Sequence, residues 1–224
     1  MVSGSRLMNL EQARFNMVEQ QIRTWEVLNQ DVLDLLFEIK REEFLPQRSH
    51  ALAFVDMAAP IGFGEFTWPP KLEARVIQEL SLKKSDRVLE IGSGCGYLTA
   101  LLARSTRHVT SVEIIPELSA FAEKNLRAHA VDNITLAVGD GAQGWKSAQP
   151  FDVIVLTGST QVLPEAFLQN LSPGGRLFAI IGEDPIMKAT LVSRNTANDV
   201  DRRTLFETSI PPLKHALLRE QFVF

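Results

Sequence analysis

The strongest chemical signature in this sequence is a glycine-rich run that follows a short apolar stretch. At a turn between a strand and a helix, glycines let the backbone approach a bound cofactor at the carboxyl edge of a parallel sheet. A nicotinamide dinucleotide site has the spacing G-x-G-x-x-G, whereas the third glycine here comes two residues after the second. The residues that this run predicts at a cofactor are Glu90, Gly92, Ser93, Gly94, Gly96 and Tyr97.

Two acidic residues follow the next two apolar stretches. Glu113 lies about 20 residues beyond Gly92, where a carboxylate can accept hydrogen bonds from both ribose hydroxyls. Asp140 is followed by Gly141, and a carboxylate there can accept a hydrogen bond from the exocyclic amine of an adenine. Each acid alone has an ordinary explanation, as a solvated residue before a helix or as an Asx-turn former. S-adenosylmethionine has a ribose and an adenine but no pyrophosphate, so the three sites together predict this cofactor rather than a dinucleotide.

Other chemistries have weaker support. The four histidines are far apart in sequence and match no zinc-ligand spacing, so we expect no metal. Cys95 lies inside the glycine turn, where we expect a packing role rather than a nucleophile. Residues 156–159 read Leu-Thr-Gly-Ser, instead of the Asn-Pro-Pro-aromatic run associated with methylation of base amines. Asp152 opens the strand before them, away from the cofactor edge, so we expect it to have a structural role.

A parallel sheet is needed to bring these residues together. From residue 71 onward, short apolar stretches alternate with helical patterns, which is typical of a doubly wound α/β fold whose mostly parallel sheet is covered on both faces. Residues 189–193 and 204–208, joined by a polar stretch, predict a C-terminal antiparallel hairpin. The other predicted strands are residues 88–91, 108–112, 134–138, 152–156 and 176–181, with helices at 116–129 and 163–170 and a turn at 172–175.

The first 70 residues have a different pattern. A second helix is expected to open at Asn29 and to end at Pro46. Residues 58–70 contain three prolines and two glycines, and predict an ordered loop rather than a helix or strand. We expect residues 1–70 to form N-terminal helices and a substrate loop, packed in one structural unit on an S-adenosylmethionine-binding core of residues 71–224. The first helix is predicted by an apolar stripe made of Phe15, Val18, Ile22 and Trp25.

Composition and charge narrow the class of protein. A chain of 224 residues with 45% hydrophobic residues is long enough for one α/β core. The formal net charge is −4 and the basic residues form no patch, so nucleic acids and membranes are not expected partners. No apolar run approaches the roughly 20 residues that cross a bilayer, and the N-terminus lacks the apolar part of a signal peptide. We therefore expect a cytoplasmic protein.

Together the motifs resemble those of the protein-L-isoaspartate O-methyltransferase family. The likeness covers nearly the whole chain, and its most specific part is the upstream run of residues 53–56 and 60–64. The other matching motifs are residues 88–97, 113, 115–118, 139–141 and 173–177. The resemblance implies the S-adenosylmethionine-dependent methyltransferase fold. It also implies methyl transfer to the carboxylate of an isoaspartyl residue in a damaged peptide or protein, a repair reaction that leaves S-adenosylhomocysteine.

One segment departs from the family pattern. Members usually carry a Thr-Ile-Ser-x-Pro run that lines the active site, and Phe66 and Trp68 stand in register with its threonine and serine. Thr67, between them, is the candidate to supply the missing hydroxyl at the reaction centre. By the same resemblance, the candidate substrate-binding residues are Ile61, Gly62, Phe66 and Trp68.

The methyl acceptor stays open at this point. A carboxylate with a pKa of about 3.9 is ionised near neutral pH, so it needs no strong general base, and the enzyme's main task is alignment. The alternative is a family member that binds S-adenosylmethionine but has another acceptor or no turnover, and that uses its aromatic loop to bind a peptide or partner. A nicotinamide-dependent oxidoreductase is a more distant alternative. The two are distinguished by whether S-adenosylmethionine or a nicotinamide cofactor raises the melting temperature of the protein.

Overall fold

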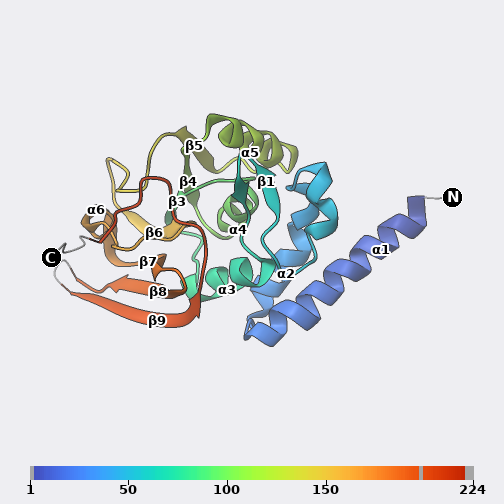
Figure 1. Cartoon of the computed structure of the whole chain (residues 1–224), viewed down its shortest axis with the longest axis horizontal. Coiled ribbons are helices and arrows are strands. Elements are labelled where there is room, and N and C mark those ends of the chain that lie inside the picture. Colours follow the sequence, from blue (N-terminus) through green and yellow to red (C-terminus); the bar gives the residue numbers. More distant parts are fainter. Residues whose placement is uncertain (1–2, 197–198, 220–224) are drawn as a thin grey trace.

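The computed structural model describes residues 3–196 and 199–219, and a seven-stranded sheet lies at its centre (Figure 1). The strand order is β5-β4-β3-β6-β7-β8-β9. The first five strands are parallel, whereas β8 pairs antiparallel with β7 on one side and with β9 on the other. This arrangement confirms the predicted doubly wound, mostly parallel sheet with a C-terminal antiparallel hairpin. The bounds are β3 Arg87–Ile91, β4 His108–Glu113, β5 Ile134–Val138, β6 Phe151–Leu156, β7 Leu171–Glu183, β8 Ile186–Arg194 and β9 Val200–Thr208.

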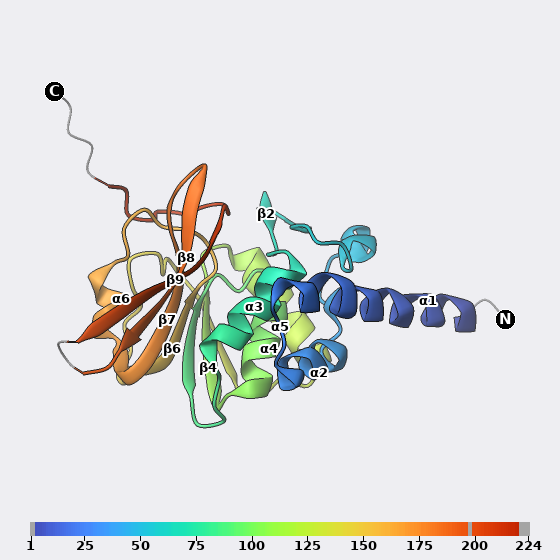
Figure 2. The ribbon, with the colours of Figure 1, turned by 90° about the horizontal axis from the view of Figure 1, so that it is seen from below.

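Helices cover both faces of this sheet. Figure 2 shows α3, α4 and α5 on one face, together with the N-terminal helices, and α6 on the other. Side chains alternate along a strand, so neighbouring residues enter different cores. Val88 packs in the core beneath α3, α4 and α5, whereas Leu89 packs in a second core with Phe167 of α6. The bounds are α3 Pro70–Leu80, α4 Tyr97–Ser105, α5 Pro116–Ala128 and α6 Glu165–Gln169.

The chain enters this body through a long helix. α1 (Ser3–Asn16) extends away from the sheet and continues into a π-helical turn, Met17–Ile22, and a 3-10 turn, Arg23–Trp25 (Figures 1 and 2). Val18 is buried as expected, but Phe15 is half exposed, so its place in the buried stripe was predicted wrongly. The π-helical turn explains this, because its hydrogen bonds span one residue more than those of an α-helix and so rotate the stripe.

The second helix, α2 (Gln30–Glu38), begins where the sequence predicts. The side chain of Asn29 caps it by accepting a hydrogen bond from a backbone N–H at 2.9 Å. The predicted end at Pro46 is wrong, because the backbone is already extended at Ile39. Leaving the helix there lets Arg41 turn into the interior, where it is 1% exposed. Two short 3-10 helices follow, Arg41–Glu43 and Gln47–Leu52.

Residues 58–70 are not a plain loop. β1 (Pro60–Gly62) and β2 (Glu65–Phe66) form a small antiparallel hairpin, with Phe63 and Gly64 at positive φ in its turn. Strands this short show no alternation of apolar and polar residues, so the sequence pattern could not indicate them.

The predicted turn at residues 172–175 is a bulge inside β7. Leu171 pairs with Phe151 and Arg176 with Val153, so the residues between them bulge away from the ladder. Proline lacks the backbone N–H that a regular ladder needs, which explains the interruption at this Ser-Pro-Gly-Gly segment. At the other end of the sheet, β9 begins at Val200, before the predicted position, because exposed polar residues continue this edge strand. Within residues 3–196 and 199–219, no helix combines the length and apolar character that a membrane span requires.

Candidate active site

A cleft of about 600 Å³ opens at the carboxyl ends of β3, β4 and β6, where the strand order changes direction. Ligands of doubly wound sheets bind at this switch point. Much of the wall comes from the glycine turn, from residues 65–73 and from the C-terminal segment of residues 207–214. Among the predicted site residues, Gly62, Glu90 and Gly96 are not part of the wall. Those that line it are Ile61, Phe66, Thr67, Trp68, Gly92, Ser93, Gly94, Tyr97, Glu113, Asp140 and Gly141.

A side chain is excluded at two glycines of the turn, Gly92 and Gly96, for different structural reasons. Gly92 has φ +100° and Gly96 has φ +85°, values that favour glycine. A Cβ atom on Gly92 would collide with the hydroxyl of Thr157, which donates a hydrogen bond to the carbonyl of Ile91 at 2.7 Å. A Cβ atom on Gly96 would lie 3.2 Å from the side chain of Leu126 in α5. Gly92 therefore lets the turn approach the end of β6, and Gly96 lets it approach α5.

The carboxylate of Glu113 is held at the end of β4 against the glycine turn. Its Oε2 accepts a hydrogen bond from the N–H of Gly94 at 2.9 Å, and its Oε1 accepts one from the N–H of Ile115 at 3.1 Å. Each carboxylate oxygen can accept more than one hydrogen bond. The side chain is therefore fixed in position and retains capacity to accept two hydroxyl groups.

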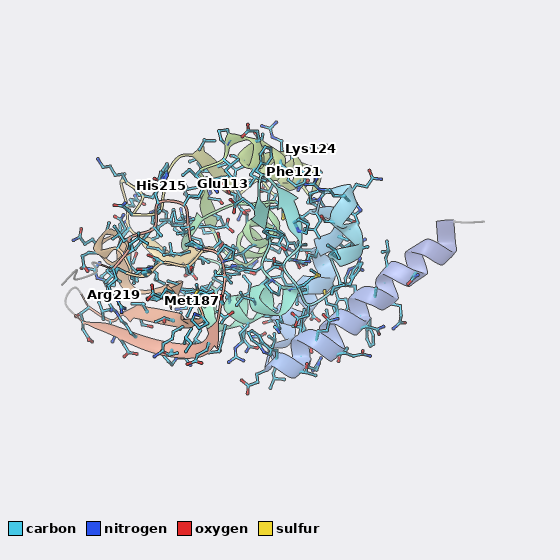
Figure 3. The ribbon with its side chains drawn as sticks, viewed as in Figure 1. Glu113, Phe121, Lys124, Met187, His215 and Arg219 are labelled. Carbon is cyan, nitrogen blue, oxygen red and sulfur yellow. The ribbon has the colours of Figure 1, made fainter. Side chains whose placement is uncertain are left out.

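Asp140 presents a carboxylate at the end of β5. Its Oδ1 accepts a hydrogen bond from the N–H of Ala142 at 3.0 Å, and its Oδ2 lies 2.7 Å from Nδ1 of His215. These two hydrogen bonds hold the pKa of Asp140 below its usual value, and the one from the N–H of Ala142 has the larger effect. Asp140 is therefore an ionised hydrogen-bond acceptor at neutral pH. Figure 3 labels His215 and Glu113, which lie on the same side of the molecule.

Glu90 lies behind the glycine turn rather than in the cleft. It is fully buried, and its Oε2 accepts hydrogen bonds of 2.6 Å from the hydroxyls of Thr99 and Ser111. Burial raises the pKa of Glu90 to about 7. The Ser111 hydroxyl also lies 2.6 Å from the hydroxyl of Ser93, which lines the cleft. Glu90 is thus linked to the predicted cofactor site through the hydroxyls of Ser111 and Ser93. The sequence predicts a direct contact between Glu90 and the cofactor, but Glu90 does not line the cleft.

Tyr97 and Cys95 form a buried part of the cleft wall. The ring of Tyr97 packs edge-on against Phe44, with the centroids 5.6 Å apart, and its hydroxyl has no hydrogen-bond partner among the described residues. Burial raises the pKa of Tyr97 well above its usual value and that of Cys95 to about 12. Cys95 is therefore a neutral thiol, as expected of a packing residue.

Residues 58–70, called the acceptor loop below, are held by hydrogen bonds within the loop and to Arg41 and Thr157 outside it. The Oγ1 of Thr67 accepts hydrogen bonds from Nη2 of Arg41 at 2.7 Å and from the N–H of Ala59 at 3.1 Å. Trp68 is 7% exposed, and its indole Nε1 donates to the carbonyl of Thr157 at 2.7 Å. Phe66 is 52% exposed at the edge of the cleft. Thr67 retains a hydroxyl proton for donation, whereas the indole proton of Trp68 is already engaged.

Comparison with known proteins now decides the family. The sequence profile described as Protein-L-isoaspartate(D-aspartate) O-methyltransferase (PCMT) matches residues 12–215. The chain belongs to this family. The protein-L-isoaspartate O-methyltransferase of Vibrio atlanticus is 42% identical over 158 residues, which are 70% of this chain and 76% of the relative. That of Picosynechococcus sp. is 34% identical over 201 residues, which are 90% of both chains.

Solved structures agree with this family assignment in their fold. A protein-L-isoaspartate O-methyltransferase has a TM-score of 0.76 and 26% identity, and the match covers 89% of this chain and 65% of that one. A second structure, described as a beta-aspartate methyltransferase (PCMT) from Plasmodium falciparum in complex with S-adenosyl-L-homocysteine, has a TM-score of 0.75 and 21% identity. That match covers 88% of this chain and 96% of the other. The methyltransferase type of fold predicted from the sequence is confirmed.

Two buried residues of this PCMT family member were missed in the sequence. Nε of Arg41 donates to Oε2 of Glu73 in α3 at 2.9 Å. The same guanidinium donates to the carbonyls of Ala53 and Trp68, at 3.0 and 2.8 Å, in addition to Thr67. The sequence does contain one indication that Glu73 is buried. This acidic residue lies on the apolar face of its helix, together with Leu72, Val76, Ile77 and Leu80.

The C-terminal segment is the other part of the site that the sequence did not indicate. After β9, the N–H of Leu213 donates to the carbonyl of Ser159 at 3.0 Å, which ties the segment to the end of β6. Lys214 then forms an ion pair of 2.6 Å with Glu65 in β2. The segment therefore contacts the end of β6, the β1–β2 hairpin and, through His215, Asp140.

Two further sequence predictions concern residues outside the cleft: the role of Asp152 and the absence of a metal site. Oδ2 of Asp152 accepts a hydrogen bond from the N–H of Arg87 at 2.9 Å, at the end of the sheet opposite the cleft, which fits the structural role expected for it. In residues 3–196 and 199–219, histidine, cysteine and acidic side chains form no group of three that could hold a metal ion.

Proposed function

We propose that this chain transfers a methyl group from S-adenosylmethionine to the side-chain carboxylate of an isoaspartyl residue in a damaged peptide or protein. Family membership supports the reaction class. The observation that carries the proposal is the position of Gly94, Glu113 and Asp140 at three adjacent strand ends, on the wall of one cleft.

On the cofactor side, the residues match the polar groups of the ligand. We assign Glu113 to the two ribose hydroxyls, because its oxygens are fixed by backbone N–H groups and still have free lone pairs. We assign Asp140, with Gly141, to the adenine amine, because it is ionised and accessible. Ser93 and Gly94 present polar groups to the remainder of the ligand, and Tyr97 closes the base of the cleft.

On the acceptor side, positioning is sufficient for the chemistry. S-adenosylmethionine supplies a methyl group on a sulfonium, and an ionised carboxylate attacks it without a general base. Thr67 is the proposed catalytic residue, because its hydroxyl is held by Arg41 and Ala59 and its proton can be donated to the carboxylate. Ile61, Phe66 and Trp68 form apolar parts of the wall, and Gly62, at φ +109°, is the last residue of β1 before the turn.

A second candidate function is supported by Phe66. A half-exposed aromatic ring at the edge of the cleft is suited to contact with a peptide. A family member that binds peptides with little or no turnover, or that methylates another carboxylate, would present the same surface. We also propose that residues 1–70 and 71–224 form one unit, because the side chains of Arg41 and Trp68 in the first part donate hydrogen bonds to Glu73 and Thr157 in the second.

Methyl transfer from labelled S-adenosylmethionine to an isoaspartyl peptide tests the proposal. The matched aspartyl peptide is the control, and we expect label on the isoaspartyl peptide alone. S-adenosylhomocysteine at a hundred times its dissociation constant should also raise the free energy of unfolding by about 2.7 kcal/mol. Stabilisation by this compound without any labelled peptide would favour the binding function, and stabilisation by NADH instead would reject the cofactor assignment.

A further inference from the structure

Glu73 is a buried carboxyl group on the acceptor side of the cleft. It belongs to α3, is 3% exposed, and lines the cleft together with Thr67, Trp68 and Tyr97. Its Oε2 accepts one hydrogen bond, from Nε of Arg41. Its Oε1 has no hydrogen-bond partner among the described residues. One oxygen of this carboxyl group is therefore free to bond to a ligand.

The geometry of Arg41 leaves Glu73 only partly neutralised. A guanidinium can engage a carboxylate with two parallel hydrogen bonds. Here a single N–H bonds to Glu73, and other N–H groups donate to Ala53 and, in the acceptor loop, to Thr67 and Trp68. The cation is thus shared between the carboxyl group and the loop that forms the acceptor site.

The groups around Glu73 decide how it responds to an anionic acceptor. Arg41 is the cation in contact with it, and the neighbouring Tyr97 and Cys95 stay neutral because burial raises their pKa values. Glu113 and Lys71 also line the cleft, and Lys71 forms an ion pair of 2.6 Å with Asp56. Burial raises the pKa of Glu73 to about 7, although Arg41 opposes this shift. Two adjacent carboxylates in a buried site cannot both remain ionised without a large penalty.

We propose that Glu73 takes up a proton when an isoaspartyl carboxylate enters the cleft, and that its Oε1–H then donates a hydrogen bond to that carboxylate. This inference rests on the proposed function and identifies a further acceptor-binding residue for it. Phe66 has no polar atom, and the indole proton of Trp68 is engaged by Thr157. Glu73 thus provides, together with Thr67, a donor that the two aromatic residues cannot supply.

The proton balance of this step is simple. The proton comes from solvent when the acceptor binds and stays on Glu73 while the new O–CH₃ bond forms and the S–CH₃ electron pair returns to sulfur. The methyl ester is neutral, so Glu73 can release the proton to solvent once the product leaves.

Proton uptake can be measured without turnover. The protein is saturated with S-adenosylhomocysteine and titrated with an isoaspartyl peptide at pH 8, in two buffers of different ionisation enthalpy. Calorimetry then gives the number of protons exchanged, and we expect an uptake of up to about one proton, which disappears near pH 5.5. In Glu73→Gln the uptake should be absent, while the peptide still binds, because the amide can accept from Arg41 and donate to the carboxylate.

A matched control is available in a second buried pair. Glu42 pairs with Arg14 and is not part of the cleft wall. Glu42→Gln should keep the proton uptake of the parent. Both variants are checked for parental affinity for S-adenosylhomocysteine, which excludes loss of the fold.

The outcomes separate this inference from the proposed function. If the peptide binds but the uptake is zero, or is the same in Glu73→Gln, the inference is wrong and the proposed function stands. Proton release on binding would also overturn it, because the complex would then hold fewer protons than the separate protein and peptide, the opposite of a protonated Glu73. If S-adenosylhomocysteine binds and the isoaspartyl peptide does not, the acceptor assignment itself is wrong and the role of Glu73 falls with it.

Discussion

The Nδ1 atom of His215 lies 2.7 Å from Oδ2 of Asp140, although 75 residues separate them in the chain. This contact brings the C-terminal segment to the carboxylate that we assign to the adenine. The neighbouring Lys214 forms an ion pair with Glu65 in β2, next to the proposed acceptor-binding residue Phe66. Consecutive residues of one segment therefore contact the cofactor side and the acceptor side of the cleft.

Asp140→Ala should weaken binding of S-adenosylhomocysteine. A hydrogen bond to a charged group contributes roughly 1.5 to 3 kcal/mol, which corresponds to about a 10- to 150-fold loss in affinity. His215→Ala leaves the carboxylate in place and should change affinity only a few-fold. Titration calorimetry at pH 7 measures both variants. Equal losses in the two would show that the affinity depends on His215 as much as on Asp140, which contradicts the assignment of the adenine contact to the carboxylate alone.

Glu113→Ala should lower the affinity by a similar factor, because the ribose loses its acceptor. The N–H groups of Gly94 and Ile115 also lose their partner, so Glu113→Gln is the milder variant and should fall between the parent and Glu113→Ala. Calorimetry gives the affinities, and circular dichroism shows whether the fold is intact. A folded Glu113→Ala protein with parental affinity would rule out this role.

The loop that departs from the family pattern is best tested at Phe66. Restoring both hydroxyls, with Phe66→Thr and Trp68→Ser, is the change that the family pattern indicates, but Trp68 is buried against Phe178 and bonds to Thr157. Replacing a buried tryptophan by a small residue costs about 3 to 5 kcal/mol of stability. Phe66→Thr alone should raise the rate on an isoaspartyl peptide by up to about a hundredfold, with unchanged stability. A parent enzyme that is already fast, with no gain in the variant, would contradict the idea that a hydroxyl is missing.

Cys95 should react slowly with iodoacetamide. Burial raises the pKa of its thiol to about 12, from an ordinary value near 9, so at pH 8 its thiolate fraction is on the order of a thousandfold smaller than that of an exposed cysteine. Saturation with S-adenosylhomocysteine should slow the reaction further, because Cys95 lies on the cleft wall. Mass spectrometry of time points follows the labelling. Fast labelling that the ligand does not affect would place the thiol outside the site.

Glu90 should make the protein less stable as the pH rises. Its pKa is about 7 in the folded protein and 4.5 in the unfolded chain, so the folded state binds more protons between these values. The stability that this proton provides is fully present below pH 4.5 and is lost as the pH rises toward 7. Glu90→Gln should remove this loss, so that its stability relative to the parent increases by up to roughly 3 kcal/mol between pH 5 and 8. Urea unfolding at both pH values measures this, with the exposed Glu117→Gln as control.

The sequence by itself determined the fold type and the cofactor side of the site. The apolar strands and amphipathic helices have periods that can be read locally, and they predict the sheet that the structure has. The glycine turn, Glu113 and Asp140 each follow directly after a strand, and strand ends of a parallel sheet meet at one edge whatever the details of packing. Their meeting in one cleft therefore follows from chain order alone.

Only the tertiary structure decided which side chains face the acceptor. The partners Arg41 and Glu73 come from separate helical segments, and Asp140 and His215 lie on opposite sides of the C-terminal hairpin in the chain. Trp68 is a further example. Its alignment with the serine of the family motif predicts a contact with the substrate, but its indole N–H donates a hydrogen bond to the carbonyl of Thr157, which the sequence does not indicate. No local period records such pairings, because they depend on how segments far apart in sequence fill the same interior space.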